Sequence, residues 1–139
     1  LAEIQQSSNL TYRLYDYNRT DANGNKRPLH IEKAVATVDY QQKPLPEQNR
    51  TVEQKDGYTE EVLCACPYFQ VSRLHLPAVA AAVSTTNAFA VLLCISGSGT
   101  MTAETGETLA FQKGQCVFVP ADTTVKELSG SADLLWITA

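Results

Sequence analysis

The sequence has no long hydrophobic run and no concentration of positive charge. Its most apolar part, residues 78–95, is interrupted by Ser84-Thr85-Thr86-Asn87, whereas a helix that crosses a bilayer needs about 20 apolar residues in a row. Its net charge is −4, and its 11 Lys and Arg are spread along 139 residues, which excludes the basic stripe typical of nucleic-acid binding. With 44% apolar and 19% charged residues, we expect a soluble globular protein.

Patterns of metal-binding or disulfide-forming cysteines are also missing. The four cysteines match neither the CxxC spacing of a zinc knuckle nor a dense disulfide scaffold; they are Cys64, Cys66, Cys94 and Cys116. Their apolar, strand-like surroundings predict buried free thiols, although Cys64-Ala-Cys66 leaves a soft-metal chelate open. No signal peptide is visible, so we expect a cytoplasmic protein. The chain starts at Leu1 rather than Met, and an earlier segment therefore remains possible.

From Thr59 onwards, short apolar stretches alternate with turn residues. Turns are predicted at residues 96–99, 104–107, 113–114 and 129–131. The strands predicted between them are residues 61–66, 69–76, 88–95, 99–103, 107–111, 115–119, 124–128 and 133–137. Many short, evenly spaced strands are typical of a β-sandwich, barrel or jelly roll. The alanine-rich segment Pro77–Val83 stays ambiguous, because alanine favours helix and its flanks favour strand.

The first 58 residues have a different character. Residues 1–19 are rich in β-formers, and we predict two short strands with a turn centred on Ser8, which would place Glu3 opposite Arg13. A turn at residues 20–25 and a short helix over residues 28–35 follow. The composition of residues 41–58 predicts an exposed connection. We therefore predict two parts, residues 1–58 and residues 59–139, in an all-β protein with one short helix.

Two stretches resemble known families. Residues 95–121, ISGSGTMTAETGETLAFQKGQCVFVPA, resemble the turn-and-strand pattern of cupins, which implies a cupin-like jelly roll but no particular activity. Residues 3–34, EIQQSSNLTYRLYDYNRTDANGNKRPLHIEKA, resemble the segment of short bacterial type I mannose-6-phosphate isomerases that follows the last metal-ligand histidine. The resemblance implies that this chain is the carboxy-terminal part of such an isomerase.

The resemblance also implies roles for three residues. That family interconverts mannose 6-phosphate and fructose 6-phosphate through an enediol beside a zinc ion. Its invariant arginine falls on Arg13, an acidic residue proposed to assist proton transfer falls on Glu3, and a basic residue falls on Arg19. A fixed guanidinium suits the charge that develops on enediolate oxygens, a carboxylate suits proton transfer, and Arg19 suits the substrate phosphate.

Each role has a simpler alternative. Arg13 and Glu3 in adjacent strands would form a cross-strand ion pair, and Arg19 would be a solvated loop charge. Asn9 stands where many relatives carry an acidic residue. The family's glutamine, glutamate and histidine zinc ligands lie upstream of this sequence. His30 and His75 are too few for a zinc site, and we interpret His30 as a structural or surface residue.

Three functions remain open from the sequence. The first is an isomerase fragment that needs its amino-terminal half, zinc included, for activity. The second is a non-catalytic cupin that binds a sugar or sugar phosphate. The third is a β-sandwich interaction module, with Arg13 structural and Pro77–Val83 facing a partner.

Overall fold

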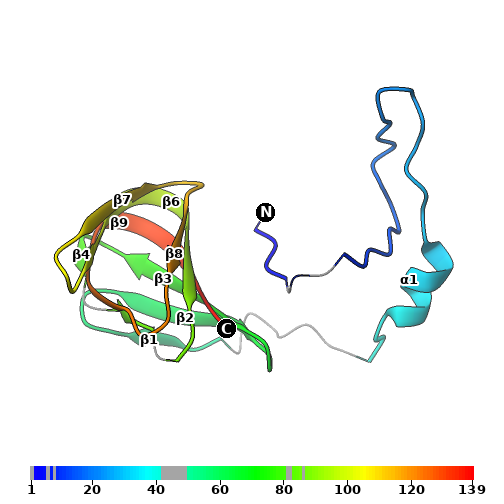
Figure 1. The fold of residues 1–139 in the computed structure, drawn as a ribbon. Coiled ribbons are helices and arrows are strands. Elements are labelled where there is room, and N and C mark those ends of the chain that lie inside the picture. Colours follow the sequence, from blue (N-terminus) through cyan, green and yellow to red (C-terminus); the bar gives the residue numbers. More distant parts are fainter. Residues whose placement is uncertain (1, 6, 8, 42–49, 81–82, 86) are drawn as a thin grey trace. The chain divides into compact units, whose positions relative to one another are not determined.

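The structure is a computed structural model that describes residues 2–5, 7, 9–41, 50–80, 83–85 and 87–139 (Figure 1). The chain divides into two compact units, Leu1–Pro44 and Leu45–Ala139, and each is described by itself. Of the connection predicted over residues 41–58, residues 42–49 lie outside the described residues, and the part after them contains the short strand Val52–Gln54. In the described part of the chain, no helix is long and apolar enough to cross a membrane.

The first unit contains the predicted short helix but not the predicted strands. Helix α1 spans Ile31–Thr37, and the amide of Ala34 donates to the carbonyl of His30 at 2.9 Å. Pro28 therefore precedes the helix by three residues rather than opening it. No described residue of the segment 1–19 lies in a strand. The prediction of two strands was wrong because β-forming side chains make a strand only where a neighbouring backbone supplies the ladder.

The first unit has almost no hydrophobic core of its own. Among its described residues, Ala34 is the only apolar side chain that is buried. Several large apolar side chains are exposed instead: Leu10, Leu14, Leu29, Ile31, Val35 and Val38. Burial of apolar surface is the main stabilising term in folding. The described residues of this unit bury little of it, so the unit depends on hydrogen bonds and ion pairs, or on packing of its exposed apolar side chains against another surface.

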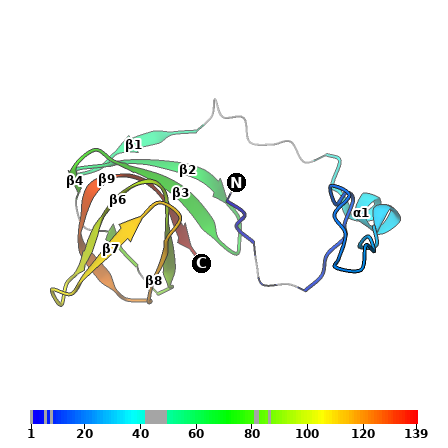
Figure 2. The ribbon, with the colours of Figure 1, turned by 90° about the horizontal axis from the view of Figure 1, so that it is seen from above.

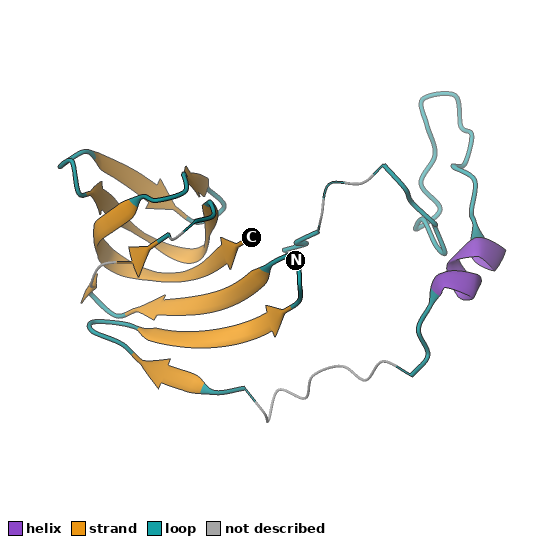
Figure 3. Ribbon diagram, turned by 60° about the horizontal axis from the view of Figure 1, so that its bottom comes forward, coloured by secondary structure: helices purple, strands orange, loops and turns teal. Residues whose placement is uncertain are grey.

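The second unit is an antiparallel sheet that rolls up on itself. Its strands follow one another as β1 Val52–Gln54, β2 Thr59–Ala65, β3 Gln70–Leu76, β4 Val79–Ala80, β5 Val83–Ser84, β6 Ala90–Ala103, β7 Thr108–Gln112, β8 Cys116–Val119 and β9 Thr124–Thr138 (Figures 1 and 3). The strand order is β1-β2-β3-β9-β6-β7, with β4 and β5 on β9 and β8 on β6. The ambiguous alanine-rich segment thus supplies β4, and residues 81–82 are not described.

Strands β6 and β9 hold the two sides of this unit together. They pair with each other from Ala90↔Thr138 to Ala103↔Val125. In one half of this long pair, β9 also pairs with β3 and β6 with β8. In the other half, β9 pairs with β4 and β5, and β6 with β7. Each long strand therefore belongs to both sides of the sandwich, and Figure 2 shows the sheet curling closed. This is the predicted all-β jelly-roll architecture.

Two predicted turns are bends inside these long strands. Residues 96–99 lie within β6 and residues 129–131 within β9, where Gly97 is opposite Ala132 and Gly99 opposite Gly130. A Cβ on Gly97 would overlap the carbonyl oxygen of Ser131, and Gly97 and Gly130 have φ of 76° and 125°. Glycine here allows two backbones to approach closely while the strands bend from one side to the other. The glycines correctly predicted a change of direction at these two places, but the change is a bend within a strand rather than a chain reversal.

The hydrophobic core lies between the two sides. One side contributes side chains such as Leu74 of β3, Leu92 of β6 and Trp136 of β9, and the other contributes Met101 and Phe111. The cysteines only partly follow the prediction. All four are free, but Cys94 alone is buried. Alternation along a strand places Cys94 on the core side, whereas the remaining three project away from it.

The bend at Gly97 gives a test with a matched control. Gly97 and Gly106 both have a positive φ, of 76° and 89°, but nothing lies within 4 Å of a Cβ added to Gly106. We expect Gly106→Ala to lower the free energy of unfolding by roughly 1–2 kcal/mol, the ordinary cost of a left-handed alanine. Gly97→Ala should cost more than about 3 kcal/mol, because the β9 backbone must also move. Urea unfolding of the 139-residue chain measures both, and equal losses would contradict the close-approach argument.

Candidate functional site

The candidate site is built on two turns in the first unit. In the first turn, the amide of Arg19 donates to the carbonyl of Asp16 at 2.9 Å, and the residues between them, Tyr17 and Asn18, both have positive φ. A two-residue turn of this kind reverses the chain tightly. It therefore brings residue 19 back beside residue 16, and the guanidinium of Arg19 lies 3.0 Å from the Asp16 carboxylate.

The second turn closes the chain between residues 20 and 26, as predicted. The Asp21 carboxylate accepts hydrogen bonds from the amides of Asn23 and Asn25, each at 2.9 Å. Such side-chain-to-backbone bonds stabilise turns, and they hold the pKa of Asp21 below its ordinary value. The turn ends in a single β-bridge between Thr20 and Lys26. The chain after Lys26 therefore returns alongside the segment that begins at Arg13.

Arg13 is held by this returning segment. Its amide donates to Nδ1 of His30 at 3.2 Å, and its carbonyl accepts from the amide of His30 at 2.7 Å. Its Nη1 donates to the carbonyl of Pro28 at 3.1 Å. The Arg13 side chain is 19% exposed, so the guanidinium is fixed but still reaches the surface. His30 therefore has a structural contact, as interpreted from the sequence, and the contact is with Arg13 itself.

Asp16 lies at the centre of an arginine cluster, which we define as Arg13, Arg19 and Arg27 around this carboxylate. Asp16 is only 7% exposed. Arg27 donates to both of its carboxylate oxygens, through Nε to Oδ2 at 2.8 Å and through Nη2 to Oδ1. Nε of Arg13 lies 4.0 Å from Oδ1. A buried carboxylate with such partners stays ionised and fixes their positions.

The electrostatics of the cluster follow from these contacts. The hydrogen bonds from Arg27 hold the pKa of Asp16 below its ordinary value, and the charges of Arg19 and Arg13 lower it further, against the opposing effect of desolvation. The carboxylate in turn raises the pKa of Arg27. Three guanidinium groups face one carboxylate, so two positive charges of the cluster are left uncompensated. The arrangement is therefore suited to bind an anion.

The sequence predicted part of this cluster. Arg13 and Arg19 were named as candidates and lie on the same carboxylate. Asp16 and Arg27 were not among the predicted site residues, although both lie in the stretch of residues 3–34 that carries the family resemblance. The sequence feature that could have predicted the cluster is the presence of arginines on both sides of a turn-rich stretch. The pairing of Glu3 with Arg13 was wrong: Glu3 is exposed, and within the described residues no hydrogen bond or ion pair joins the two.

The described residues do not fit a zinc site. No group of three or more His, Cys, Asp and Glu side chains gathers among them. Nδ1 of His30 accepts the Arg13 amide. Nδ1 of His75 lies 3.0 Å from Asp133, which also accepts from Ser96 and Arg73. These bonds, that of His75 foremost, hold the pKa of Asp133 below its ordinary value, as expected for an ion-pair network on the sheet surface.

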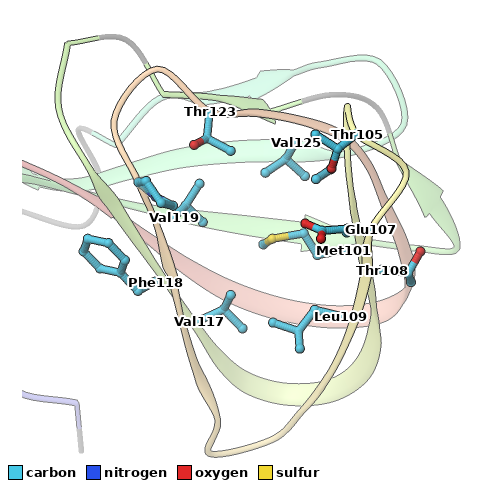
Figure 4. A pocket seen from close by; sticks show the side chains of 12 residues that line it. Met101, Thr105, Glu107, Thr108, Leu109, Val117, Phe118, Val119, Thr123 and Val125 are labelled. Atoms are coloured by element: carbon cyan, nitrogen blue, oxygen red, sulfur yellow. The ribbon is translucent and has the colours of Figure 1, made fainter.

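The second unit contains a cavity of about 720 Å³ between its two sides (Figure 4). Met101, Val117 and Val125 line its interior, while Thr105 and Glu107 lie towards the β6–β7 turn. The lining includes no Lys, Arg or His. It therefore offers no counter-charge for a phosphate, and a phosphorylated ligand fits the arginine cluster better than this cavity.

Comparison with known proteins identifies the class of the second unit and then the family. The bent, antiparallel jelly roll is a cupin fold, and a family model described as the cupin domain of mannose-6-phosphate isomerase matches residues 59–138. The chain therefore belongs to the mannose-6-phosphate isomerase family, as the sequence resemblance predicted. The fold is also shared with Pac13 from Streptomyces, a nucleoside dehydratase, at a TM-score of 0.61 and 16% identity.

The similarity extends over nearly the whole chain. The chain is 33% identical over 136 residues to mannose-6-phosphate isomerase ManA of Bacillus subtilis and 31% identical over 136 residues to that of Streptococcus mutans. These alignments cover 96% of this chain but 41% and 40% of the relatives. A crystal structure of the Bacillus subtilis mannose 6-phosphate isomerase matches 91% of this chain and 39% of its own, with a TM-score of 0.73 and 27% identity. The chain thus spans about two fifths of these relatives.

The cluster predicts a measurable titration. Carbon-13 NMR of the carboxyl groups should give Asp16 a pKa below about 3.9, the ordinary value, and Arg27→Gln should raise it towards that value. The control is Lys26→Gln, because Lys26 donates to Asn18 rather than to Asp16 and should leave this pKa nearly unchanged. Since the folded-state pKa is lowered, the stabilisation by Asp16 is present above its unfolded pKa and is lost as pH falls through the folded value. An unshifted pKa in Arg27→Gln would contradict the assignment.

Proposed function

We propose that this chain is the carboxy-terminal part of an aldose–ketose isomerase that interconverts mannose 6-phosphate and fructose 6-phosphate. The observation that carries the proposal is the arginine cluster, whose excess positive charge suits an anionic sugar phosphate. It is supported by the named isomerases to which the chain is similar along 96% of its length. As in an enzyme of central sugar metabolism, we expect the protein to act in the cytoplasm.

In this proposal, Arg13 stabilises the intermediate. Isomerisation moves a proton between adjacent carbons of the open-chain sugar through an enediol, and negative charge develops on its oxygens. A guanidinium is always charged and presents several N–H donors in a plane. The Pro28 carbonyl holds the Arg13 guanidinium, and His30 holds the Arg13 backbone. The guanidinium therefore needs little reorganisation when that charge appears, which is the condition for effective electrostatic catalysis.

Glu3 and Arg19 have the other two proposed roles. Glu3 would accept the proton from one carbon and return it to the next. Its carboxylate is exposed and has no bond to Arg13, so its place beside the substrate would depend on packing against the rest of the protein. Arg19, whose side chain is 64% exposed, would bind the phosphate.

The proposal requires a part of the protein that is not in this chain. A zinc ion would need about three protein ligands and an open position, and the described residues supply no such group. The exposed apolar side chains of the first unit, such as Ile31 and Val35, suit packing against an amino-terminal half. We expect the chain alone to be inactive.

A second candidate is a cupin that binds a sugar without catalysis. The cavity in the second unit favours it, because a volume of about 720 Å³ lined by apolar residues, threonines and Glu107 accommodates a small ligand. The coding sequence upstream of Leu1 separates the two candidates. A histidine just before Leu1 and a Gln-x-His pair further back support the isomerase, whereas an initiator methionine directly before Leu1 favours the binding module.

Kinetics of the protein that contains this chain test the role of Arg13. Arg13→Ala should lower kcat for mannose 6-phosphate by about 10²–10³-fold, the usual effect of removing one donor to a developing oxyanion. Lys33→Ala is the control, since Lys33 lies on α1 outside the cluster, and it should retain normal turnover. Normal turnover of Arg13→Ala would exclude the catalytic role.

A further inference from the structure

We propose that Arg19 and Arg27, held in place by Asp16, form a binding site for a phosphomonoester dianion. The ligand class is inferred from charge and geometry, and its identification with the phosphate of a sugar substrate rests on the function proposed above. Arg27 is then a second phosphate-binding residue. Asp16 is a positioning residue, which acts through the two arginines and does not touch the ligand.

The first step in the argument is the position of the two arginines. Arg19 directly precedes Thr20 and Arg27 directly follows Lys26, and Thr20 and Lys26 form the β-bridge. The two arginines therefore stand on neighbouring arms of one turn. Like charges facing each other across such a pair are destabilising. In this turn the repulsion between the two arginines is offset by the buried Asp16 carboxylate, which forms an ion pair with each of them.

The second step is the number of charges. One carboxylate neutralises one of the three guanidinium groups in the cluster, so an excess of two positive charges remains. A phosphomonoester carries about −1.5 to −2 charges at pH 7. Lys26, on the same turn, is held by Asn18 at 3.0 Å, and its charge is offset by the Asp21 carboxylate of that turn. The cluster itself therefore keeps its excess of two positive charges, about the charge that one phosphate group would neutralise.

The third step is the availability of donors. Arg27 uses Nε and Nη2 for Asp16, and among the described residues its Nη1 has no hydrogen-bond or ion-pair partner. The side chains of Arg27 and Arg19 are 49% and 64% exposed, although Asp16 between them is only 7% exposed. The carboxylate therefore fixes the inner edges of both groups, and their outer edges remain able to bind phosphate oxygens.

The fourth step is that the site is formed before any ligand binds. The Arg19 guanidinium lies over the Tyr17 ring at 5.8 Å, and Tyr15 packs edge-on against Tyr17 with centroids 5.1 Å apart. Tyr17 and Asn18 have φ of 53° and 54°, a conformation that costs a non-glycine residue free energy. Such strain persists where the surrounding contacts require it, and it is common at binding sites. Fixing two long side chains in advance lowers the entropic cost of binding an anion.

The test uses the protein that contains this chain and two substrates, mannose 6-phosphate and unphosphorylated mannose. We expect Arg27→Gln to raise KM for mannose 6-phosphate at least tenfold with kcat changed less than threefold, and to lower any turnover of mannose much less. The matched control is Lys33→Gln, which removes one positive charge outside the cluster. An equal loss with both substrates would mean a structural role for Arg27 and would overturn the proposal.

Asp16→Asn distinguishes positioning from simple charge. Asparagine has the same shape but no charge, so the variant increases the positive excess of the cluster. If Asp16 only diminished the local charge, inorganic phosphate would bind more tightly to the variant. If Asp16 positions the arginines, phosphate should bind at least fivefold more weakly despite the added positive charge. Tighter binding would therefore overturn the positioning role.

Direct binding keeps this inference separate from the proposed function. Inorganic phosphate, titrated at low salt and followed by amide shifts of Arg19 and Arg27, reports the site whether or not the protein turns over a sugar. Chloride at equal ionic strength is the control for general screening. Phosphate binding that Arg27→Gln weakens, in a protein without isomerase activity, would retain the site and reject the isomerase. Isomerase activity with phosphate affinity unaffected by Arg27→Gln would do the reverse.

Discussion

The second unit depends on the pairing of β6 with β9, the two strands that belong to both sides of the jelly roll. All other strands except β1 and β2 pair directly with one of these two. Their bends occur where Gly97, Gly99 and Gly130 let the backbones approach more closely than any side chain would allow. The core side chains, such as Leu92 and Leu134, are buried because these bends bring the two sides face to face.

The first unit is stabilised by a different kind of interaction. With one buried apolar side chain among its described residues, it cannot rely on hydrophobic burial. Instead, Asp16 joins three arginines, and His30 and Pro28 join the returning segment to Arg13. Because the Arg19 and Arg27 side chains are largely exposed, their ion pairs with Asp16 contribute little stability in water. A segment held mainly by such contacts is therefore better suited to present charged groups than to fold independently.

The sequence predicted the second unit well because its signals are local and repeated. Alternation of apolar residues located most strands, and glycine located the places where direction changes. The glycine pattern did not distinguish a bend inside a strand from a chain reversal, because the difference depends on which strand lies opposite. Gly99 of β6, for example, lies opposite Gly130 of β9. The apolar surroundings of the four cysteines predicted that all are buried, whereas only Cys94 lies in the core.

The candidate site was only half visible in the sequence, and the structure explains why. The family resemblance over residues 3–34 implied roles for Arg13 and Arg19 but not for their partners. In the structure, Arg13 bonds to His30 and Asp16 bonds to Arg27. Such pairing depends on the two turns between these residues and has no fixed sequence spacing. The family model, in turn, matches residues 59–138, where the sequence had indicated only the fold. The family model therefore supports the second part of the chain, whereas the alignments with the named isomerases extend over both parts.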